Sequence, residues 1–175
     1  MVKAMFRYCP SCASPNITFE RNRVFRCPGC GFVYYHNTAA AAGCIIETGG
    51  TIALLVRAKE PSLGKLDLPG GFVDPGEGVT EGLRRELREE IGWDPDAAFS
   101  FFASFPNIYP YKGIPYNTCD LFFTLSAPGL QREDLRLDPG EIADVRFLRP
   151  AEIDPADLAF DSTRRVIRAY LERRR

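Results

Sequence analysis

Residues 71–93 read Gly71-Phe-Val-Asp-Pro-Gly-Glu77, then Gly-Val-Thr-Glu-Gly-Leu-Arg, then Arg85-Glu-Leu-Arg-Glu-Glu-Ile-Gly-Trp93, and this stretch decides the fold. Apolar side chains recur in it every four positions, at Val79, Leu83, Leu87 and Ile91. That spacing places them on one face of a helix. We therefore predict a helix over 79–91, with Gly78 as its N-cap and with Gly92 ending it.

Three carboxylates on that helix are spaced so that they share one face. Glu86, Glu89 and Glu90 stand at positions i, i+3 and i+4, where like charges repel each other. Because the apolar stripe runs directly beside them, we expect these glutamates to be partly desolvated, where unpaired charge is unfavourable. A hard divalent cation such as Mg²⁺ takes carboxylate oxygens and would turn the repulsion into attraction. A solvated acidic helix face is the alternative interpretation.

The whole stretch resembles the Nudix box, G-x5-E-x7-R-E-U-x-E-E-x-G-U, in which U is a bulky apolar residue. Trp93 fills the last U position and is larger than the usual aliphatic side chain. The other required residues are Gly71, Glu77, Arg85, Glu86, Leu87, Glu89, Glu90 and Gly92. The resemblance implies an α/β fold, the Nudix α/β/α sandwich with a mixed sheet, and an enzyme that hydrolyses a diphosphate linkage in a nucleotide.

The resemblance also implies a role for each position of the box. The catalytic Mg²⁺ or Mn²⁺ would be bound by the Gly71 carbonyl and by three carboxylates, those of Glu86, Glu89 and Glu90. Arg85 would hold the carboxylates in place through an ion pair with Glu77 or its neighbours. Gly82 is unfavourable inside a helix by about 1 kcal/mol relative to alanine, so we expect another segment to approach it closely.

A catalytic base outside the box is often supplied by a later loop in this family. Glu141 resembles that position, within Asp138-Pro-Gly-Glu-Ile-Ala-Asp144, and Asp144 is the weaker candidate. The alternative for Glu141 is an ordinary surface residue in a turn.

Four cysteines near the N-terminus form two C-x2-C pairs, Cys9-Pro-Ser-Cys12 and Cys27-Pro-Gly-Cys30. Residues 17–25 between the pairs are typical of a β-hairpin. Four thiolates at this spacing predict a tetrahedral structural Zn²⁺ site, and so small a module rarely folds without a metal. We therefore expect a zinc ribbon over 1–36, with two redox pairs as the alternative. Arg21, Arg23 and Arg26 alternate with aromatic residues and suggest a nucleic-acid face, but a solvated hairpin is the favoured interpretation.

The remainder, residues 37–175, is expected to form the Nudix domain. Gly49-Gly50 is typical of a hairpin turn. Strands are predicted over 43–47, 51–57, 99–105, 118–126 and 144–148. The stretch between the third and fourth of these is predicted to be a long loop. A closing helix is expected from about 163 to 172, with Asp161 or Ser162 as its cap.

A ribbon followed by this domain resembles the NADH pyrophosphatase branch of the family, in which the motif S-Q-P-W-P-F-P-x-S follows the box. The chain keeps three residues of that motif, Ser104, Pro106 and Pro110. It departs from the motif at Phe105, Asn107, Ile108 and Lys112, while Tyr109 replaces one aromatic residue with another. The same stretch resembles the proline-bearing segment of ADP-ribose pyrophosphatases. The candidates for stacking on a nucleotide base are Phe105, Tyr109 and Tyr111, with aromatic packing in a loop as the alternative.

The resemblance implies NAD(H) or ADP-ribose as the small-molecule substrate and AMP as a product. One alternative is the removal of an NAD-type cap from RNA. Another is a non-catalytic nucleotide-sensing regulator, which would be expected to have lost carboxylates of the box.

The composition is that of an ordinary globular chain, with 45% hydrophobic and 26% charged residues. A formal net charge of −1 gives no long-range attraction for polyanions, so a nucleic-acid partner is not favoured. Lys3 and Arg7 interrupt the N-terminal apolar residues, and no apolar run is long enough to span a membrane. We therefore expect a cytoplasmic protein without a membrane segment. Relatives in this branch are often homodimers, but the sequence itself leaves the oligomeric state open.

Overall fold

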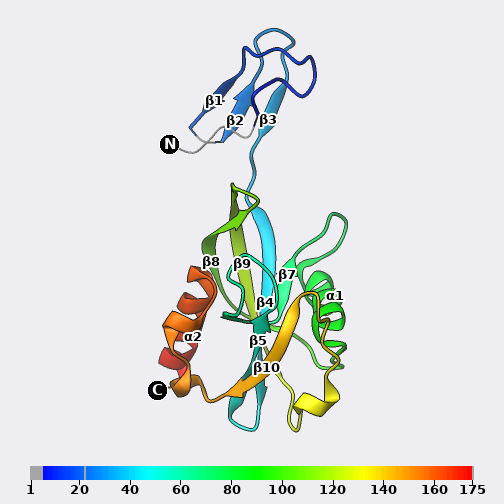
Figure 1. Ribbon diagram of the computed structural model, residues 1–175, viewed down its shortest axis with the longest axis vertical. Helices are drawn as coiled ribbons and strands as arrows, with labels where there is room; N and C mark the ends of the chain where they lie inside the picture. The colour runs from blue at the N-terminus through cyan, green and yellow to red at the C-terminus, as the bar shows by residue number, and fades with distance from the viewer. Residues whose placement is uncertain (1–5, 22, 175) are drawn as a thin grey trace.

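The computed structural model describes residues 6–21 and 23–174, so Lys3 and parts of the predicted 1–36 and 37–175 units lie outside the described residues. It contains a small sheet and a large sheet (Figure 1). The small sheet consists of β1 (Thr18–Glu20), β2 (Val24–Arg26) and β3 (Val33–Tyr35). The large sheet consists of β4 (Ala39–Thr48), β5 (Thr51–Arg57), β6 (Leu66–Asp67), β7 (Gly70–Phe72), β8 (Ser100–Tyr111), β9 (Ile114–Ser126) and β10 (Ile142–Leu148). The helices are α1 (Val79–Ile91) and α2 (Asp161–Arg173), with 3-10 turns η1 (Arg132–Asp134), η2 (Pro150–Glu152) and η3 (Pro155–Asp157).

The large sheet is mixed, as predicted. Its strands lie in the order β10-β5-β4-β9-β8, with β6 paired to β5 and β7 paired to β4. β4 and β9 are parallel, whereas the other pairs are antiparallel. Gly49 and Gly50 join β4 to β5 with φ angles of 55° and 82°, which is the backbone that a tight hairpin turn requires.

One helix covers each face of the large sheet (Figure 1). Both faces are apolar, because each contributes to its own buried cluster. Along β4, Cys44 and Ile46 pack in the cluster that contains α1, whereas Ile45 packs in the cluster that contains α2. Successive side chains of a strand point to opposite faces, so one continuous apolar run supplies both layers. The predicted α/β/α sandwich is confirmed.

Helix α1 begins and ends at the predicted residues. Gly78 is its N-cap in an extended conformation, and Gly92 ends it in the left-handed conformation with φ 63°. The Gly92 N–H bonds to the carbonyls of Leu87 and Arg88, which would otherwise lack partners at the helix end. Leu83 and Leu87 are fully buried against the sheet, and burial of each such side chain contributes roughly 2 kcal/mol.

The prediction of a long loop between residues 105 and 118 is wrong. β8 and β9 extend through this stretch as a hairpin in continuous register from Ala103 to Ile114, with Pro110 opposite Pro115. β8 is the edge strand of the sheet and has no strand on its outer side. A proline whose nitrogen faces outward therefore removes no hydrogen bond between strands. The candidate aromatic residues therefore lie on strands rather than on a loop.

The predicted cap of the closing helix is also wrong. The N-cap of α2 is Phe160, which makes no side-chain cap hydrogen bond. Asp161 instead pairs with Arg165 at 2.7 Å, one turn further along the helix. The Ser162 hydroxyl donates to Asp120 in β9 at 2.6 Å, so this side chain joins the helix to the sheet.

The strands of the small sheet alternate with the cysteine pairs along the chain: β1 and β2 lie between the two pairs, and β3 follows the second pair. β1 and β2 form the predicted hairpin, and β3, which was not predicted, adds to β2. Phe25 is 2% exposed and its ring stacks on that of Phe19, with 4.0 Å between the centroids. Residues 36–38 connect this sheet to β4.

Candidate functional site

The candidate active site is built where β7 passes α1. Gly70 has a φ of 138°, and a Cβ atom there would lie 2.1 Å from the Ala42 carbonyl oxygen, so only glycine fits. This close approach brings the Gly70 N–H to Oε2 of Glu90, to which it donates at 2.8 Å. A Cβ atom on the next residue, Gly71, would lie 2.5 Å from Cδ of Glu86. The two glycines therefore admit two carboxylates of the helix.

Arg85 connects three carboxylates, those of Glu77, Glu86 and Glu89. Its Nη2 donates to Oε1 of Glu77 at 2.7 Å and to the Phe72 carbonyl at 3.0 Å. Its Nη1 donates to Oε1 of Glu86 and to Oε2 of Glu89, both at 2.9 Å. The predicted ion pair between Arg85 and Glu77 is present. The planar guanidinium thus holds one carboxylate from the loop before the helix and two carboxylates from the helix itself. A lysine could not bind all three with the same geometry.

Gly82 makes room for this arrangement. A Cβ atom at Gly82 would lie 2.6 Å from Oε1 of Glu77, so the predicted close approach is confirmed and the segment involved is the loop before the helix. Glu77 also accepts a hydrogen bond from the Asp74 amide at 2.7 Å. The Arg85 hydrogen bond, followed by that of the amide, holds the pKa of Glu77 below its usual value.

The three box glutamates differ in their surroundings. Burial raises the pKa of Glu90 well above its usual value, since the residue is only 8% exposed. Burial also raises the pKa of Glu86, although Arg85 opposes the shift. The side chain of Glu89 is 59% exposed and stands at the solvent edge. The expected partial desolvation therefore holds for Glu86 and Glu90 but not for Glu89.

This donor set suits a divalent cation. Hard oxygen ligands are concentrated here: burial raises the pKa of Glu86 and of Glu90, and the negative charge of Glu141 adds to both shifts. In the described residues the ligand atoms of these glutamates are not gathered as tightly as the thiols of the four cysteines. Glu86 and Glu89 are engaged with Arg85, and Glu90 with the Gly70 amide. A cation would therefore compete with these partners for the carboxylates.

The loop that carries Glu141 is attached to the same helix. The Asp138 N–H donates to the Glu90 carbonyl at 3.0 Å, and the Glu141 carbonyl accepts from Ala58 at 2.7 Å. The Glu141 carboxylate pairs with Lys59, and its charge contributes to the raised pKa of Glu90. Glu141 thus lies in the electrostatic neighbourhood of the box. Asp144 is exposed and pairs with Arg132 at 3.5 Å.

A cavity of about 120 Å³ lies beside the box and is lined in part by Gly70 and Gly71. Four aromatic residues also line it: Phe72, Tyr109, Phe122 and Phe160. The Tyr109 ring is 5.3 Å from that of Phe72 and 5.5 Å from that of Phe160, measured between centroids. Tyr109, a candidate from the sequence, therefore lies next to the box. Phe72 and Phe160 were missed because their contribution depends on the fold and not on a local pattern.

The other two aromatic candidates lie elsewhere. Phe105 packs against Phe122, with 6.3 Å between ring centroids, and lines a larger open cleft of about 880 Å³. Tyr111 is 45% exposed near the β8–β9 turn, where Lys112 lies over its ring at 5.2 Å. Within the described part of the chain, Tyr111 lines neither hollow. The larger cleft and the cavity share three lining residues, Asn107, Thr118 and Phe160.

Polar side chains that the sequence did not single out form one wall of the cavity. Oδ1 of Asp67 accepts from the Thr163 hydroxyl at 2.7 Å, and Arg57 Nη1 lies 3.5 Å from Asp67 Oδ2. Burial raises the pKa of Asp67 to about 6. Asp120 in β9 faces the same cavity and accepts from Ser162. In the sequence, only Asp120, a single carboxylate within the apolar run of β9, indicated that polar side chains line this part of the cavity.

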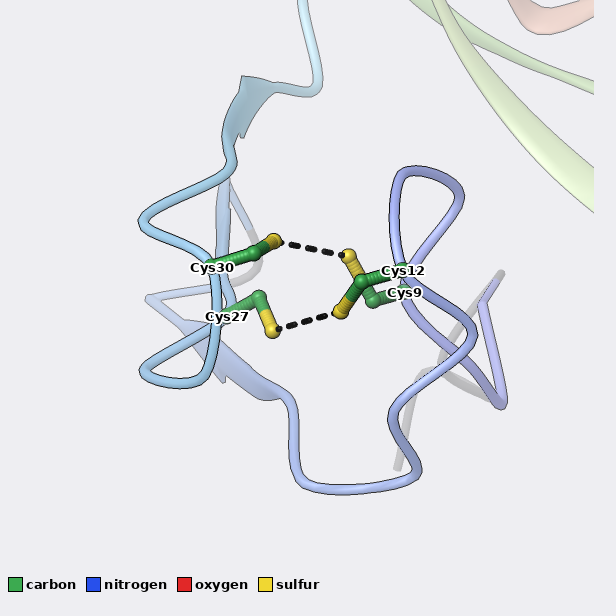
Figure 2. Close-up of side chains that lie close together, drawn as sticks. All are labelled: Cys9, Cys12, Cys27 and Cys30. Atoms are coloured by element: carbon green, nitrogen blue, oxygen red, sulfur yellow. Dashed lines mark hydrogen bonds between the residues drawn. The ribbon is translucent and has the colours of Figure 1, made fainter.

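The four cysteines of the ribbon face one another from two loops (Figure 2). Their sulfur atoms all lie within 4.8 Å of one another. The Sγ atoms of Cys9 and Cys30 are 3.6 Å apart, and those of Cys12 and Cys27 are 3.7 Å apart. A tetrahedral zinc ion with Zn–S bonds of about 2.3 Å separates its sulfurs by about 3.8 Å, so these thiols fit zinc. The two contacts join one C-x2-C pair to the other.

Neither helix within residues 6–21 and 23–174 has the length and apolar character needed to cross a membrane.

Several proteins of known sequence resemble this chain. The NAD-capped RNA hydrolase NudC of Stutzerimonas stutzeri is 28% identical over 169 residues, which cover 96% of this chain and 57% of the relative. The ADP-ribose pyrophosphatase of Methanocaldococcus jannaschii is 44% identical over 63 residues, which cover 36% of this chain and 37% of the relative. The chain thus spans a little over half the length of the NudC relative and matches a shorter part of the other.

Solved structures resemble the chain over most of its length. A NUDIX hydrolase from Nitrosomonas europaea superposes with a TM-score of 0.67 at 26% identity, covering 97% of this chain and 92% of that one. The NUDIX domain of Shewanella oneidensis NrtR, crystallised with ADP ribose, has a TM-score of 0.65 at 20% identity, covering 81% of this chain and 91% of that one. The second likeness concerns the fold alone. The family model described as NUDIX domain matches residues 36–170, a range that includes the complete box, and the chain belongs to the Nudix family.

Proposed function

We propose that this chain is a metal-dependent hydrolase that cleaves the diphosphate linkage of a nucleoside diphosphate derivative, with NAD(H) or ADP-ribose as substrate and AMP as a product. One observation carries the proposal: the complete set of box carboxylates is organised by Arg85 and Gly70 beside a cavity lined by aromatic rings. A non-catalytic sensor is disfavoured, because it would not be expected to retain every carboxylate of the box.

The residues of the candidate active site have different roles in the proposed hydrolysis. The box glutamates and the Gly71 carbonyl would hold Mg²⁺ or Mn²⁺, which would supply charge neutralisation at the diphosphate oxygens and a lowered pKa of water. Arg85 keeps Glu86 and Glu89 in place, and Gly70 orients Glu90. In the reaction a water oxygen bonds to one phosphorus, the bridging P–O bond breaks, and a proton passes to a base. Glu141 is our candidate for that base, since it lies close enough to the box to influence its pKa values.

A second candidate function is the removal of an NAD-type cap from RNA. It is favoured by the likeness to a protein named NAD-capped RNA hydrolase and by the open cleft of about 880 Å³ that adjoins the cavity. Arg164 and Arg165 line that cleft, and in this second candidate function their guanidinium groups would bind phosphates of the RNA chain, with Arg165 exchanging its ion pair with Asp161 for such a contact.

We also propose that the four cysteines bind a structural zinc ion. All four positions of a tetrahedral site are supplied by thiols, which leaves none open for catalysis. The small sheet buries few large side chains, so the ion would provide much of its stability. A homodimer, which the resemblance to this branch suggests, stays a prediction that light scattering of the purified protein would check.

The test of the proposed reaction is a substrate panel. Purified protein is incubated with Mg²⁺ or Mn²⁺ and with NADH, NAD⁺, ADP-ribose, FAD, dinucleoside polyphosphates, nucleoside triphosphates or an RNA carrying a 5′ NAD cap. Products are separated by chromatography. The proposal predicts AMP from NADH or ADP-ribose, and release of a 5′-monophosphate RNA would favour the second candidate. Tight nucleotide binding without turnover of any substrate would contradict both.

A further inference from the structure

Two buried polar atoms stand out in the described residues because they have no hydrogen-bond partner: Oγ1 of Thr118 and Oδ1 of Asp120. Thr118 is 3% exposed and Asp120 is 9% exposed. Both belong to β9 and are two positions apart, so their side chains point to the same face of the sheet. Leaving a buried polar atom unpaired is unfavourable by about 1–3 kcal/mol, and such atoms therefore require an explanation.

Both residues line the cavity of about 120 Å³ beside the box. Phe72, Tyr109 and Phe160 line the same cavity, so it combines aromatic rings with two unpaired hydrogen-bonding atoms. Pockets for whole small-molecule ligands usually measure about 300–1,000 Å³, so this cavity is sized for one part of a ligand. The adjoining cleft of about 880 Å³ has room for the rest.

We propose that Asp120 and Thr118 determine specificity by recognising an aromatic ring that carries an NH₂ group next to a hydrogen-bond acceptor. This inference rests on the proposed function, since the ring belongs to the nucleotide substrate. The Asp120 carboxylate accepts a hydrogen bond from the NH₂ group, and the Thr118 hydroxyl donates to the acceptor. The amino edge of adenine and the carboxamide of nicotinamide share this chemistry.

The hydrogen bond that Asp120 makes within the protein determines which of its oxygens can bind the ligand. Ser162 donates to Oδ2 at 2.6 Å, so Oδ1 is the oxygen that stays available to the cavity. Arg57 is engaged with Asp67 and lies over the Phe160 ring at 5.1 Å. The Asp67 and Asp120 carboxylates line this wall. A ring with an oxo group in place of NH₂ would set an acceptor against the Asp120 acceptor, and a carboxylate in place of the carboxamide would meet like charge. Such a ring should be rejected.

A purely structural role for Asp120 explains only part of these observations. The hydrogen bond from Ser162 ties α2 to the sheet, and Thr163 makes a parallel contact with Asp67. Neither contact accounts for Oδ1 of Asp120 or for the hydroxyl of Thr118. A substitution that keeps the Ser162 contact but alters the cavity side separates the two roles.

Asp120→Asn is that substitution. The asparagine oxygen can still accept from Ser162, while its NH₂ group turns a cavity acceptor into a donor. The measurement is kcat/KM in matched substrate pairs: ADP-ribose against its hypoxanthine analogue, and NAD⁺ against nicotinic acid adenine dinucleotide. We expect the parent protein to prefer the NH₂ form of one pair by about 100-fold or more, and the variant to lose most of that preference or invert it. Asp96→Asn, at an exposed position after α1, is the matched control and should keep the parent ratio.

Thr118→Val provides a second variant that does not endanger the fold. The hydroxyl makes no hydrogen bond within the protein, so replacing it with a methyl group should leave thermal unfolding unchanged or raise its midpoint. We expect kcat/KM for the preferred substrate to fall by about tenfold with the NH₂ discrimination weakened. If Asp120→Asn does not fold, this variant alone decides the question.

The outcomes distinguish the two proposals. A shift confined to the adenine pair places adenine in the cavity, and a shift confined to the nicotinamide pair places nicotinamide there. Turnover by the parent protein with ratios that neither variant changes would overturn the role of Asp120 and Thr118 and leave the proposed function intact. No turnover by the parent protein would overturn the proposed function, and this inference with it.

Discussion

The backbone N–H of Gly70 donates a 2.8 Å hydrogen bond to Oε2 of Glu90, so a strand and a helix meet at one buried carboxylate. Glu90 is buried and its pKa is raised well above the usual value, and this amide is the contact that opposes the rise. The backbone of β7 thus orients a carboxylate that the surrounding protein would otherwise disfavour in its charged form.

The two glycines of β7 should respond differently to alanine. Gly70→Ala places a Cβ atom 2.1 Å from a backbone carbonyl in a conformation that disfavours side chains, and it should lower the free energy of unfolding by about 2 kcal/mol or more. Gly71→Ala meets only the movable Glu86 side chain, so it should fold normally and lose most activity. Urea unfolding and turnover of ADP-ribose measure the two effects. Equal stability losses in both variants would contradict this explanation.

Gly82→Ala should separate stability from activity. Alanine is favoured over glycine in a helix by about 1 kcal/mol, but its Cβ atom would displace the Glu77 carboxylate from Arg85. We expect the free energy of unfolding to change by about 1 kcal/mol or less and the catalytic affinity for Mg²⁺ to fall by about tenfold. Thr80→Ala, on the exposed side of the same helix, is the control for helix propensity alone. Unchanged Mg²⁺ dependence in Gly82→Ala would count against the role of Glu77.

Asp67 should make the folded state less stable as the pH rises. Burial raises its pKa from 3.8 to about 6, so the folded state holds the proton more tightly than the unfolded state. The resulting stability is present below about pH 4 and is lost as the pH rises through about 6, by at most about 3 kcal/mol. The asparagine of Asp67→Asn cannot titrate. The contributions of the other carboxylates to the unfolding free energy are common to the parent protein and the variant, so they cancel in the difference between the two. The unfolding free energy of the parent protein, relative to this variant, should therefore fall between pH 4 and pH 7. A constant difference would refute the assignment.

The ribbon should depend on zinc while the large sheet does not. Metal analysis of the purified protein should find about one zinc ion per chain, and Cys27→Ser should reduce that content sharply. Amide hydrogen exchange should then increase across β1–β3, with α1 still protected. Cys119→Ser, an exposed cysteine outside the cluster, should keep its zinc. Full zinc content in Cys27→Ser would contradict a four-thiolate site.

Local patterns explain what could be predicted from the sequence. The bounds of α1 follow from its apolar period and from a glycine at each end, both of which act within a few residues. The box places Glu86, Glu90 and Arg85 by their spacing on that one helix. The cysteine pairs are equally local, and their sulfur atoms meet as expected.

Long-range relationships explain what could not be predicted. Pro106, Pro110 and Pro115 argue against strands, yet the first two lie on an edge strand that tolerates them. The cavity wall depends on the contact of Asp120 with Ser162, which lies 42 residues away in the chain. The cap of α2 was mispredicted for the same reason, because Ser162 makes this contact and not a cap.

The most direct test of the central claim is AMP release from ADP-ribose by the parent protein and by Glu90→Gln, with Mg²⁺ or Mn²⁺ present. Glutamine keeps an oxygen for the Gly70 amide, and a neutral group suits this buried position, so thermal unfolding without added metal should be unchanged or should move to a higher temperature. We expect kcat to fall by about 1,000-fold or more, while Glu81→Gln at an exposed position of the same helix stays close to the parent value. A folded Glu90→Gln protein that releases AMP at the parent rate would contradict the assignment of this carboxylate to the catalytic metal site.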